Sequence, residues 1–94
     1  MSELEDLRKE IDLADEKIAE LFEKRMSYVK DIALYKSQNG IPVFDMNREE
    51  YLIKKNSEII SDELIRSYDI KFLINMMDIS KDYQGRVISD NQDR

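Results

Sequence analysis

Three polar side chains stand where the helical repeat of the sequence calls for apolar residues: Arg25, Ser80 and Gln84. Burying a guanidinium or an amide without a partner is costly, so an inward polar side chain needs either a protein partner or a ligand. Taken singly, each has an ordinary explanation, since most arginines on long helices are exposed and a polar residue in a helical bundle often only fixes the register. Together they predict a polar pocket inside a helical protein.

Two further cations, Arg8 and Lys36, are predicted to lie on the same helix as Arg25. Arg25 and Lys36 are eleven residues apart, which is three helical turns, so their side chains point within about 20° of one another. Arg8 precedes Arg25 by seventeen residues, or about 25 Å along the helix axis, and no small metabolite spans that gap. If Arg8 serves the same pocket as Arg25, it must come from a second copy of the helix in an antiparallel dimer.

The helix that carries these cations is predicted over residues 3–38. Ser2 is a competent N-cap, and Gly40 followed by Pro42 ends the helix. Its apolar seam is defined by residues at alternating spacings of three and four: Leu4, Leu7, Ile11, Ala14, Ile18, Leu21, Tyr28, Ile32 and Tyr35. Such a helix is about 50 Å long, whereas a compact globule of this size is only about 32 Å across. The seam therefore needs partners beyond this chain, which predicts that the helix is the shared spine of a homodimer.

Two shorter helices are predicted after the long one. A helix over residues 46–60 starts behind Asp45, a candidate N-cap, and a helix over residues 62–88 starts near Ser61 and Asp62. From Gly85 onward the sequence becomes polar, and residues 89–94 are expected to form a frayed tail. The predicted fold class is therefore all-α, with three helices in one domain over residues 1–94 and one very long N-terminal helix.

The composition narrows the possible chemistry. The chain has no cysteine and no histidine, which removes disulfides, thiol chemistry, the usual zinc sites and imidazole acid–base catalysis. The net charge of −6 argues against nucleic acid or an anionic membrane as partner, so cations that bind an anion must be concentrated in one pocket. The first residues lack the plan of a signal peptide and no segment has the length of a membrane span, so a cytoplasmic location is expected.

Further polar positions complete a recognisable set. Over nearly its whole length, from Leu4 to about Gln84, the chain resembles the all-helical (bacterial type II) chorismate mutases. Each local signature, such as Asp45-x-x-Arg48-Glu49 or Ser80-x-x-x-Gln84, is weak alone, but the agreement of eight polar positions in order and spacing is specific. The matching residues are Arg8, Arg25, Lys36, Asp45, Arg48, Glu49, Ser80 and Gln84.

The resemblance implies an intertwined antiparallel homodimer of three-helix chains that rearranges chorismate to prephenate, the branch-point step toward phenylalanine and tyrosine. This reaction is a unimolecular pericyclic shift that needs no nucleophile, general base, metal or cofactor. Catalysis must instead hold the reactive diaxial conformer of the substrate and place positive charge where the breaking ether bond gathers electron density. The absence of histidine and cysteine is therefore no objection to an enzyme of this class.

Catalytic roles carry over by position. The resemblance implies that Arg25 and Arg8 of the partner subunit clamp the two carboxylates of chorismate, for which the planar guanidinium is a suited donor. It implies that Lys36 and Gln84 donate hydrogen bonds to the ether oxygen. These bonds strengthen in the transition state, so the two residues are expected to affect turnover as well as binding.

The remaining positions of the set are expected to shape the pocket. The resemblance implies that Glu49 and the backbone at Asp45 receive the ring hydroxyl, with Arg48 and Ser80 completing the wall. For two of them a structural explanation is equally available. An Asp that opens a helix needs no substrate to explain it, and a Glu in the first helical turn is favoured by the helix dipole.

Other interpretations stay open for the sequence alone. Isochorismate pyruvate lyase, a sister activity in the same family, uses a similar cationic pocket on a related substrate. A non-catalytic helical dimerisation module would account for the seam but gives no reason to place Arg25, Lys36 and Gln84 inside. A regulatory or excised domain of a larger aromatic-pathway enzyme is the third alternative. The mutase is favoured over these three alternatives because it accommodates the full eight-residue set.

Overall fold

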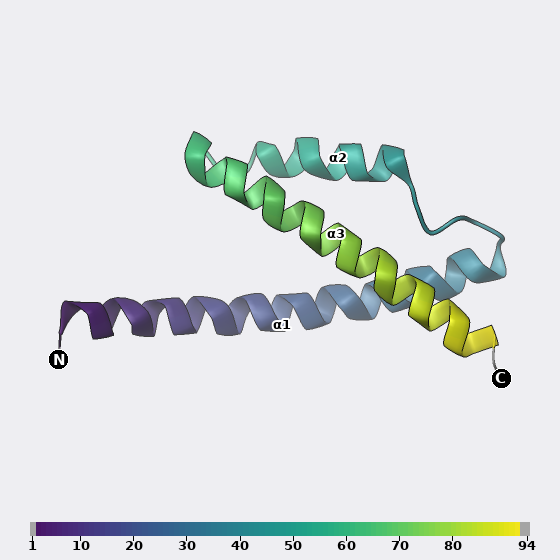
Figure 1. Cartoon of the computed structure of the whole chain (residues 1–94), viewed down its shortest axis with the longest axis horizontal. Coiled ribbons are helices and arrows are strands. Elements are labelled where there is room, and N and C mark those ends of the chain that lie inside the picture. Colours follow the sequence, from purple (N-terminus) through teal and green to yellow (C-terminus); the bar gives the residue numbers. More distant parts are fainter. Residues whose placement is uncertain (1, 93–94) are drawn as a thin grey trace.

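The computed structural model describes residues 2–92, and this part of the chain is helical apart from its connecting turns. The three helices are α1 (Glu3–Gln38), α2 (Met46–Ser57) and α3 (Glu63–Gln92). In Figure 1, α3 runs diagonally from the end of α2 to the C-terminal part of α1, so that it contacts both of the other helices. The all-helical fold with one long N-terminal helix is thus confirmed.

Local capping interactions determine where α1 begins and ends. The Ser2 side chain accepts a hydrogen bond from the backbone N–H of Glu5 at 3.1 Å. At the other end Gly40 has φ of 63°, and the N–H of Ile41 reaches back to the carbonyl of Lys36 at 2.9 Å. This pair of features is a Schellman closure, which places glycine in the left-handed conformation that other residues avoid. The helix therefore spans the residues expected from the sequence.

The bounds of the other two helices differ from the prediction. The end of α2 is Ser57, three residues before the expected residue 60, because the N–H groups of Glu58 and Ile59 close a tighter turn on carbonyls three residues back. Asp62 then caps α3 by accepting from the N–H of Ile65 at 3.0 Å. Because Asp62 is the cap, α3 begins at residue 63 and not at residue 62.

The predicted frayed tail is wrong over residues 89–92, where α3 continues as a helix to Gln92. An Arg86–Asp90 pair one turn apart, with an N–O distance of 3.2 Å, supports this last part of the helix. No glycine or proline follows Gly85 to interrupt it. Residues 93 and 94, the rest of the predicted tail, lie outside the described residues.

The apolar core of the chain is small and lies where α3 crosses α1. Its buried apolar side chains are Val29 and Ala33 of α1 with Leu73 and Met77 of α3. Val29 and Ala33 are not members of the apolar seam, so α3 packs on a neighbouring face of α1 and leaves the seam uncovered. Every residue of α1 before Arg25 is exposed. The N-terminal half of the long helix is therefore an arm whose apolar seam is largely exposed.

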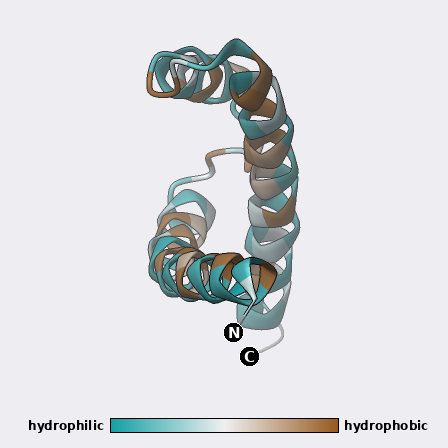
Figure 2. Cartoon of the chain, turned by 90° about the vertical axis from the view of Figure 1, so that its left-hand side faces the viewer, coloured by the Kyte–Doolittle hydropathy of each residue, from teal (hydrophilic) through white to brown (hydrophobic). Residues whose placement is uncertain are grey.

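The overall dimensions show how much surface is left open. The radius of gyration is 16.9 Å, against about 12 Å for a compact chain of this length. The accessible surface is 7738 Å², against about 5,700 Å² for a compact monomer of this mass. Seen from the N-terminal end of α1, the three helices form a bracket that is open on one side (Figure 2).

Among the described residues, none of the helices is long and apolar enough to cross a membrane.

The two glycines offer a matched test of these backbone assignments. A Cβ added at Gly40 or at Gly85 meets no atom within 4 Å, so packing does not distinguish them. We expect Gly40→Ala to destabilise the fold by about 1–2 kcal/mol, because alanine resists the left-handed conformation. Gly85→Ala should stabilise it by about 1 kcal/mol, because alanine favours a helix. Urea unfolding of both variants at one protein concentration measures the difference, and equal effects would contradict the assignment.

Candidate active site

A pocket of about 280 Å³ lies where the C-terminal half of α1, the connector to α2 and the middle of α3 meet. α1 supplies cations and apolar side chains to the pocket. The N-terminal part of α2 lines one side of it, and α3 supplies mainly polar side chains. The lining residues are Arg25, Tyr28, Val29, Ile32, Lys36, Val43, Asp45, Arg48, Glu49, Leu52, Met77, Ser80, Lys81 and Gln84.

This pocket brings together seven of the eight positions singled out from the sequence; the exception is Arg8. Arg8 lies on the exposed arm of α1, far along the helix from the residues that line the pocket. Its separation from the pocket follows from the straight helix between them. Within one chain the proposed set is therefore incomplete.

Arg25 is half-buried and is held by α3. Its Nη1 donates a hydrogen bond to Oγ of Ser80, and that hydroxyl donates in turn to the backbone carbonyl of Met76 at 2.8 Å. Ser80 is only 5% exposed, so this contact is shielded from solvent. Burial lowers the pKa of Arg25, and the nearby charge of Arg48 lowers it further. A guanidinium nevertheless remains protonated at neutral pH, so the pocket contains a partly desolvated cation.

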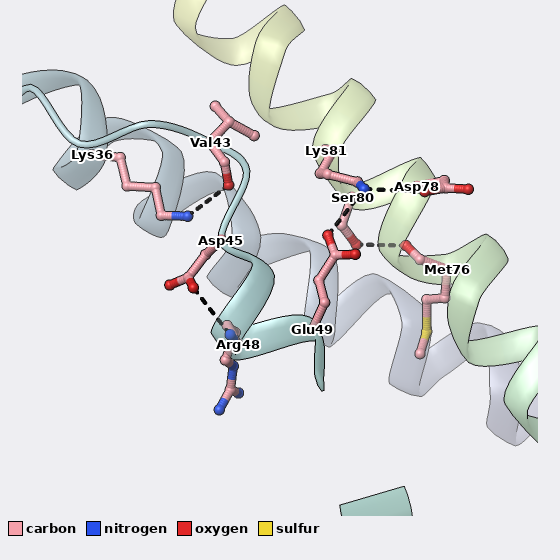
Figure 3. Close-up of polar contacts among 9 residues, drawn as sticks. All are labelled: Lys36, Val43, Asp45, Arg48, Glu49, Met76, Asp78, Ser80 and Lys81. Atoms are coloured by element: carbon pink, nitrogen blue, oxygen red, sulfur yellow. Dashed lines mark hydrogen bonds and ion pairs between the residues drawn. The ribbon is translucent and has the colours of Figure 1, made fainter. Parts of the chain in front are cut away.

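Lys36 joins the end of α1 to the connector. Its Nζ donates to the carbonyl of Val43 at 2.9 Å, as Figure 3 shows. An ammonium group has three protons, so this contact leaves others available for a ligand. The last turn of α1 carries Lys36 on the same side as Arg25, as their spacing predicted.

Asp45 and Arg48 open α2 at the edge of the pocket. Asp45 Oδ1 accepts from the backbone N–H of Arg48 at 3.0 Å, which is an N-cap (Figure 3). The guanidinium of Arg48 lies 5.2 Å from the centre of the Tyr51 ring, a cation–π contact. The carboxylate of Asp45 therefore has the structural role that the sequence left as an alternative, while the charge of Arg48 is near the pocket.

Glu49 faces a lysine that the sequence analysis missed. Its carboxylate lies 3.0 Å from Nζ of Lys81, which also pairs with Asp78 of the same helix at 3.2 Å (Figure 3). Hydrogen bonds to Glu49 and then Asp78 raise the pKa of Lys81. The sequence shows that Asp78 and Lys81 share a helical face, but not that the first turn of α2 packs against that face.

Gln84 is buried, with 7% of its surface exposed, as its position in the helical repeat of α3 predicted. Its Oε1 has no hydrogen-bond partner among the described residues. The oxygen and nitrogen of an amide are assigned by their surroundings, so the unused capacity belongs to the side chain as a whole. An unpartnered buried amide at a pocket is ready to bind a polar ligand atom.

The charges of the pocket are unbalanced in a specific way. Within residues 2–92, the ion pairs include Lys17–Glu20, Arg86–Asp90 and the two of Lys81, and Arg25, Lys36 and Arg48 have no carboxylate partner there. The two carboxylates of the pocket are occupied by a helix N-terminus and by Lys81. Nor do the described residues include a cluster of three or more metal-ligating side chains. The arrangement can bind a small anion with more than one carboxylate.

Fold and pocket thus define an all-helical protein with a positively charged pocket between its helices. Residues 7–85 match the sequence family described as chorismate mutase type II. The chain is 30% identical to a chorismate mutase of Methanocaldococcus jannaschii, in an alignment that covers 100% of this chain and 96% of the relative. The chain therefore belongs to the type II chorismate mutase family, as the resemblance indicated, and the match supports the isomerisation of chorismate to prephenate as its activity.

A second relative matches over a shorter segment. It is the T-protein of Haemophilus influenzae, 41% identical over 49 residues that cover 52% of this chain and 13% of the relative. No solved structure gives a significant match to the chain. The family assignment is therefore based on sequence similarity alone. The pocket described above is a separate observation, made on the structure of this chain.

The charge imbalance predicts an effect on stability. Removing the partly desolvated charge with Arg25→Met relieves repulsion from Arg48, while Ser80 keeps its bond to Met76. We expect the unliganded protein to be unchanged or stabilised by up to about 1 kcal/mol, since solvent screens a half-exposed charge. Urea unfolding without ligand measures this, and a loss beyond about 1 kcal/mol would mean that Arg25 serves mainly to hold the fold.

Proposed function

We propose that this chain rearranges chorismate to prephenate in the pocket between its three helices, and that a second copy of the chain completes that pocket. The observation that carries the proposal is the set of three cations, Arg25, Lys36 and Arg48, with no carboxylate partner in the described chain. A direct test is to follow chorismate consumption by the purified protein and to identify prephenate as the product.

The substrate is a dianion, and the pocket supplies complementary charge. Arg25 binds one carboxylate with its planar guanidinium, since Ser80 occupies only Nη1 and leaves other N–H donors free. The hydrogen bond to Ser80 fixes the orientation of that guanidinium before substrate arrives. Such preorganisation lowers the entropy lost on binding and favours one conformer of a flexible substrate.

The rearrangement is accelerated by groups aimed at the ether oxygen. Lys36 keeps its hydrogen bond to Val43 and donates a second hydrogen bond to the ether oxygen, while Gln84 donates one from its buried amide. Both act in a partly dry site, where hydrogen bonds to developing negative charge are strongest. The loss of one such preorganised donor costs on the order of 10²–10³ in kcat. Glu49 and the backbone at Asp45 receive the ring hydroxyl.

A second copy of the chain supplies Arg8. The arm of α1 is exposed throughout, and two of its seam residues, Leu7 and Ile11, are more than half exposed. The surface in excess of a compact monomer is about 2,000 Å², which is in the range of obligate homodimer interfaces. An antiparallel pairing of two α1 helices covers these seams and carries Arg8 of the partner subunit to the pocket that holds Arg25.

A crossed site, in which Arg8 of one subunit serves the pocket of the other, can be tested by mixing inactive chains. We expect an Arg8→Ala chain and an Arg25→Ala chain to form a heterodimer with about one intact site, because one pocket then receives both arginines. The measurement is the chorismate turnover of heterodimers isolated with two affinity tags.

The matched control uses the same substitutions in another distribution. A chain that carries both R8A and R25A, paired with the unchanged chain, leaves each pocket one arginine short and should be inactive. If this control heterodimer is as active as the mixed one, or if the mixed heterodimer recovers nothing, the crossed site is refuted.

The proposed role of Gln84 predicts how kcat depends on pH. The unchanged protein should be insensitive to pH near neutrality, because a neutral amide donates at any pH. In Gln84→Glu only the protonated carboxyl donates, so activity should be present at low pH and lost as the pH rises through the pKa of the new group. The readout is kcat against pH for both proteins, and a flat profile for the variant would exclude the assigned role.

A further inference from the structure

Lys81 is a member of the pocket that the carried-over set of site residues does not contain. Its ammonium lies between the carboxylates of Glu49 and Asp78, at 3.0 Å and 3.2 Å, and 5.1 Å from the centre of the Phe44 ring. Three different segments therefore hold it: the connector, α2 and its own helix α3. Its side chain is 30% exposed, and contacts with three segments restrain it more than a single surface ion pair would.

Glu49 is the only carboxylate of the described pocket that is not used as a helix cap. It shares the pocket with Arg25, Lys36 and Arg48, none of which has a carboxylate partner in residues 2–92. Its side chain is 24% exposed, so its charge is only partly screened by water. Opposite charges that share a partly desolvated pocket attract one another more strongly than they do in bulk water. If Lys81 did not hold it, Glu49 would be drawn toward one of these three cations, which line the same pocket.

We propose that Lys81 is a positioning residue that holds Glu49 against α3 and so keeps Arg25, Lys36 and Arg48 free for the carboxylates of the substrate. The inference rests on the proposed function, because it concerns how this pocket stays ready for a dianion. Lys81 contacts the carboxylate of Glu49, and it acts through that side chain. In Figure 3 its ammonium approaches Glu49 from the α3 side, away from Lys36 and Arg48.

The test compares two lysines of the same helix. In Lys81→Met the carboxylate of Glu49 is released, and we expect KM for chorismate to rise roughly threefold to tenfold, with kcat within about twofold of the unchanged protein. KM carries the effect because Glu49 then competes with the substrate for the same cations. Lys71→Met is the matched control: Nζ of Lys71 also lies 5.1 Å from the centre of a ring, that of Tyr68, but Lys71 does not line the pocket. This control should leave KM unchanged.

A second background separates positioning from simple attraction. In the presence of Glu49→Gln there is no carboxylate to restrain, so adding K81M should leave KM within about twofold of E49Q alone. If K81M raises KM by the same factor in both backgrounds, Lys81 attracts the substrate directly and the positioning role is overturned. Lys81→Arg keeps a cation beside Glu49, so KM should stay near the unchanged value even if the methionine variant folds poorly.

The outcomes distinguish this inference from the function on which it rests. An unchanged protein that does not convert chorismate overturns both. An active protein whose KM is unaffected by K81M overturns the role of Lys81 alone. A rise in KM that is confined to the background with Glu49 supports both.

Discussion

The structure depends on an electrostatic imbalance that is kept inside one pocket. Arg25, Lys36 and Arg48 lie around a common cavity without a carboxylate partner in the described chain, although acidic residues outnumber basic ones in the sequence. Uncompensated cations repel one another and are costly to desolvate, which is seen in the lowered pKa of Arg25. A fold retains such an arrangement when a ligand supplies the missing negative charge. The rest of the architecture can be understood as the means of holding these groups in place.

The scaffold does this with very little core. Four buried apolar side chains fasten α3 across α1, and the first turn of α2 rests against α3 through Glu49 and Lys81. The same crossing places Ser80 beside Arg25, so one segment of α3 makes both the apolar packing and the hydrogen bond to Arg25. Helix ends fixed by Gly40 and Asp45 set the length of the connector. The position of Lys36 relative to α2 follows from that length.

Much of this arrangement was predictable because helices have a fixed period. The spacing of Arg25 and Lys36 along α1, and of Ser80 and Gln84 along α3, already put each pair on one face, and the structure places all four in one pocket. Caps at Ser2 and Asp45 were readable because they depend on residues three positions apart. The end of α2 and the extension of α3 to Gln92 were not, since helix ends are decided by small differences between competing turns.

The sequence by itself determined the helical class, the long α1 with its uncovered seam, and the identity of the polar residues that face inward. These follow from local periodicity and capping, which need no knowledge of distant segments. Only the tertiary structure decided that α3 packs on Val29 and Ala33 and not on the seam, and that Lys81 meets Glu49. Those contacts join residues far apart in the chain, and their free energies depend on how whole helix surfaces fit together. No short-range pattern in the sequence records that fit.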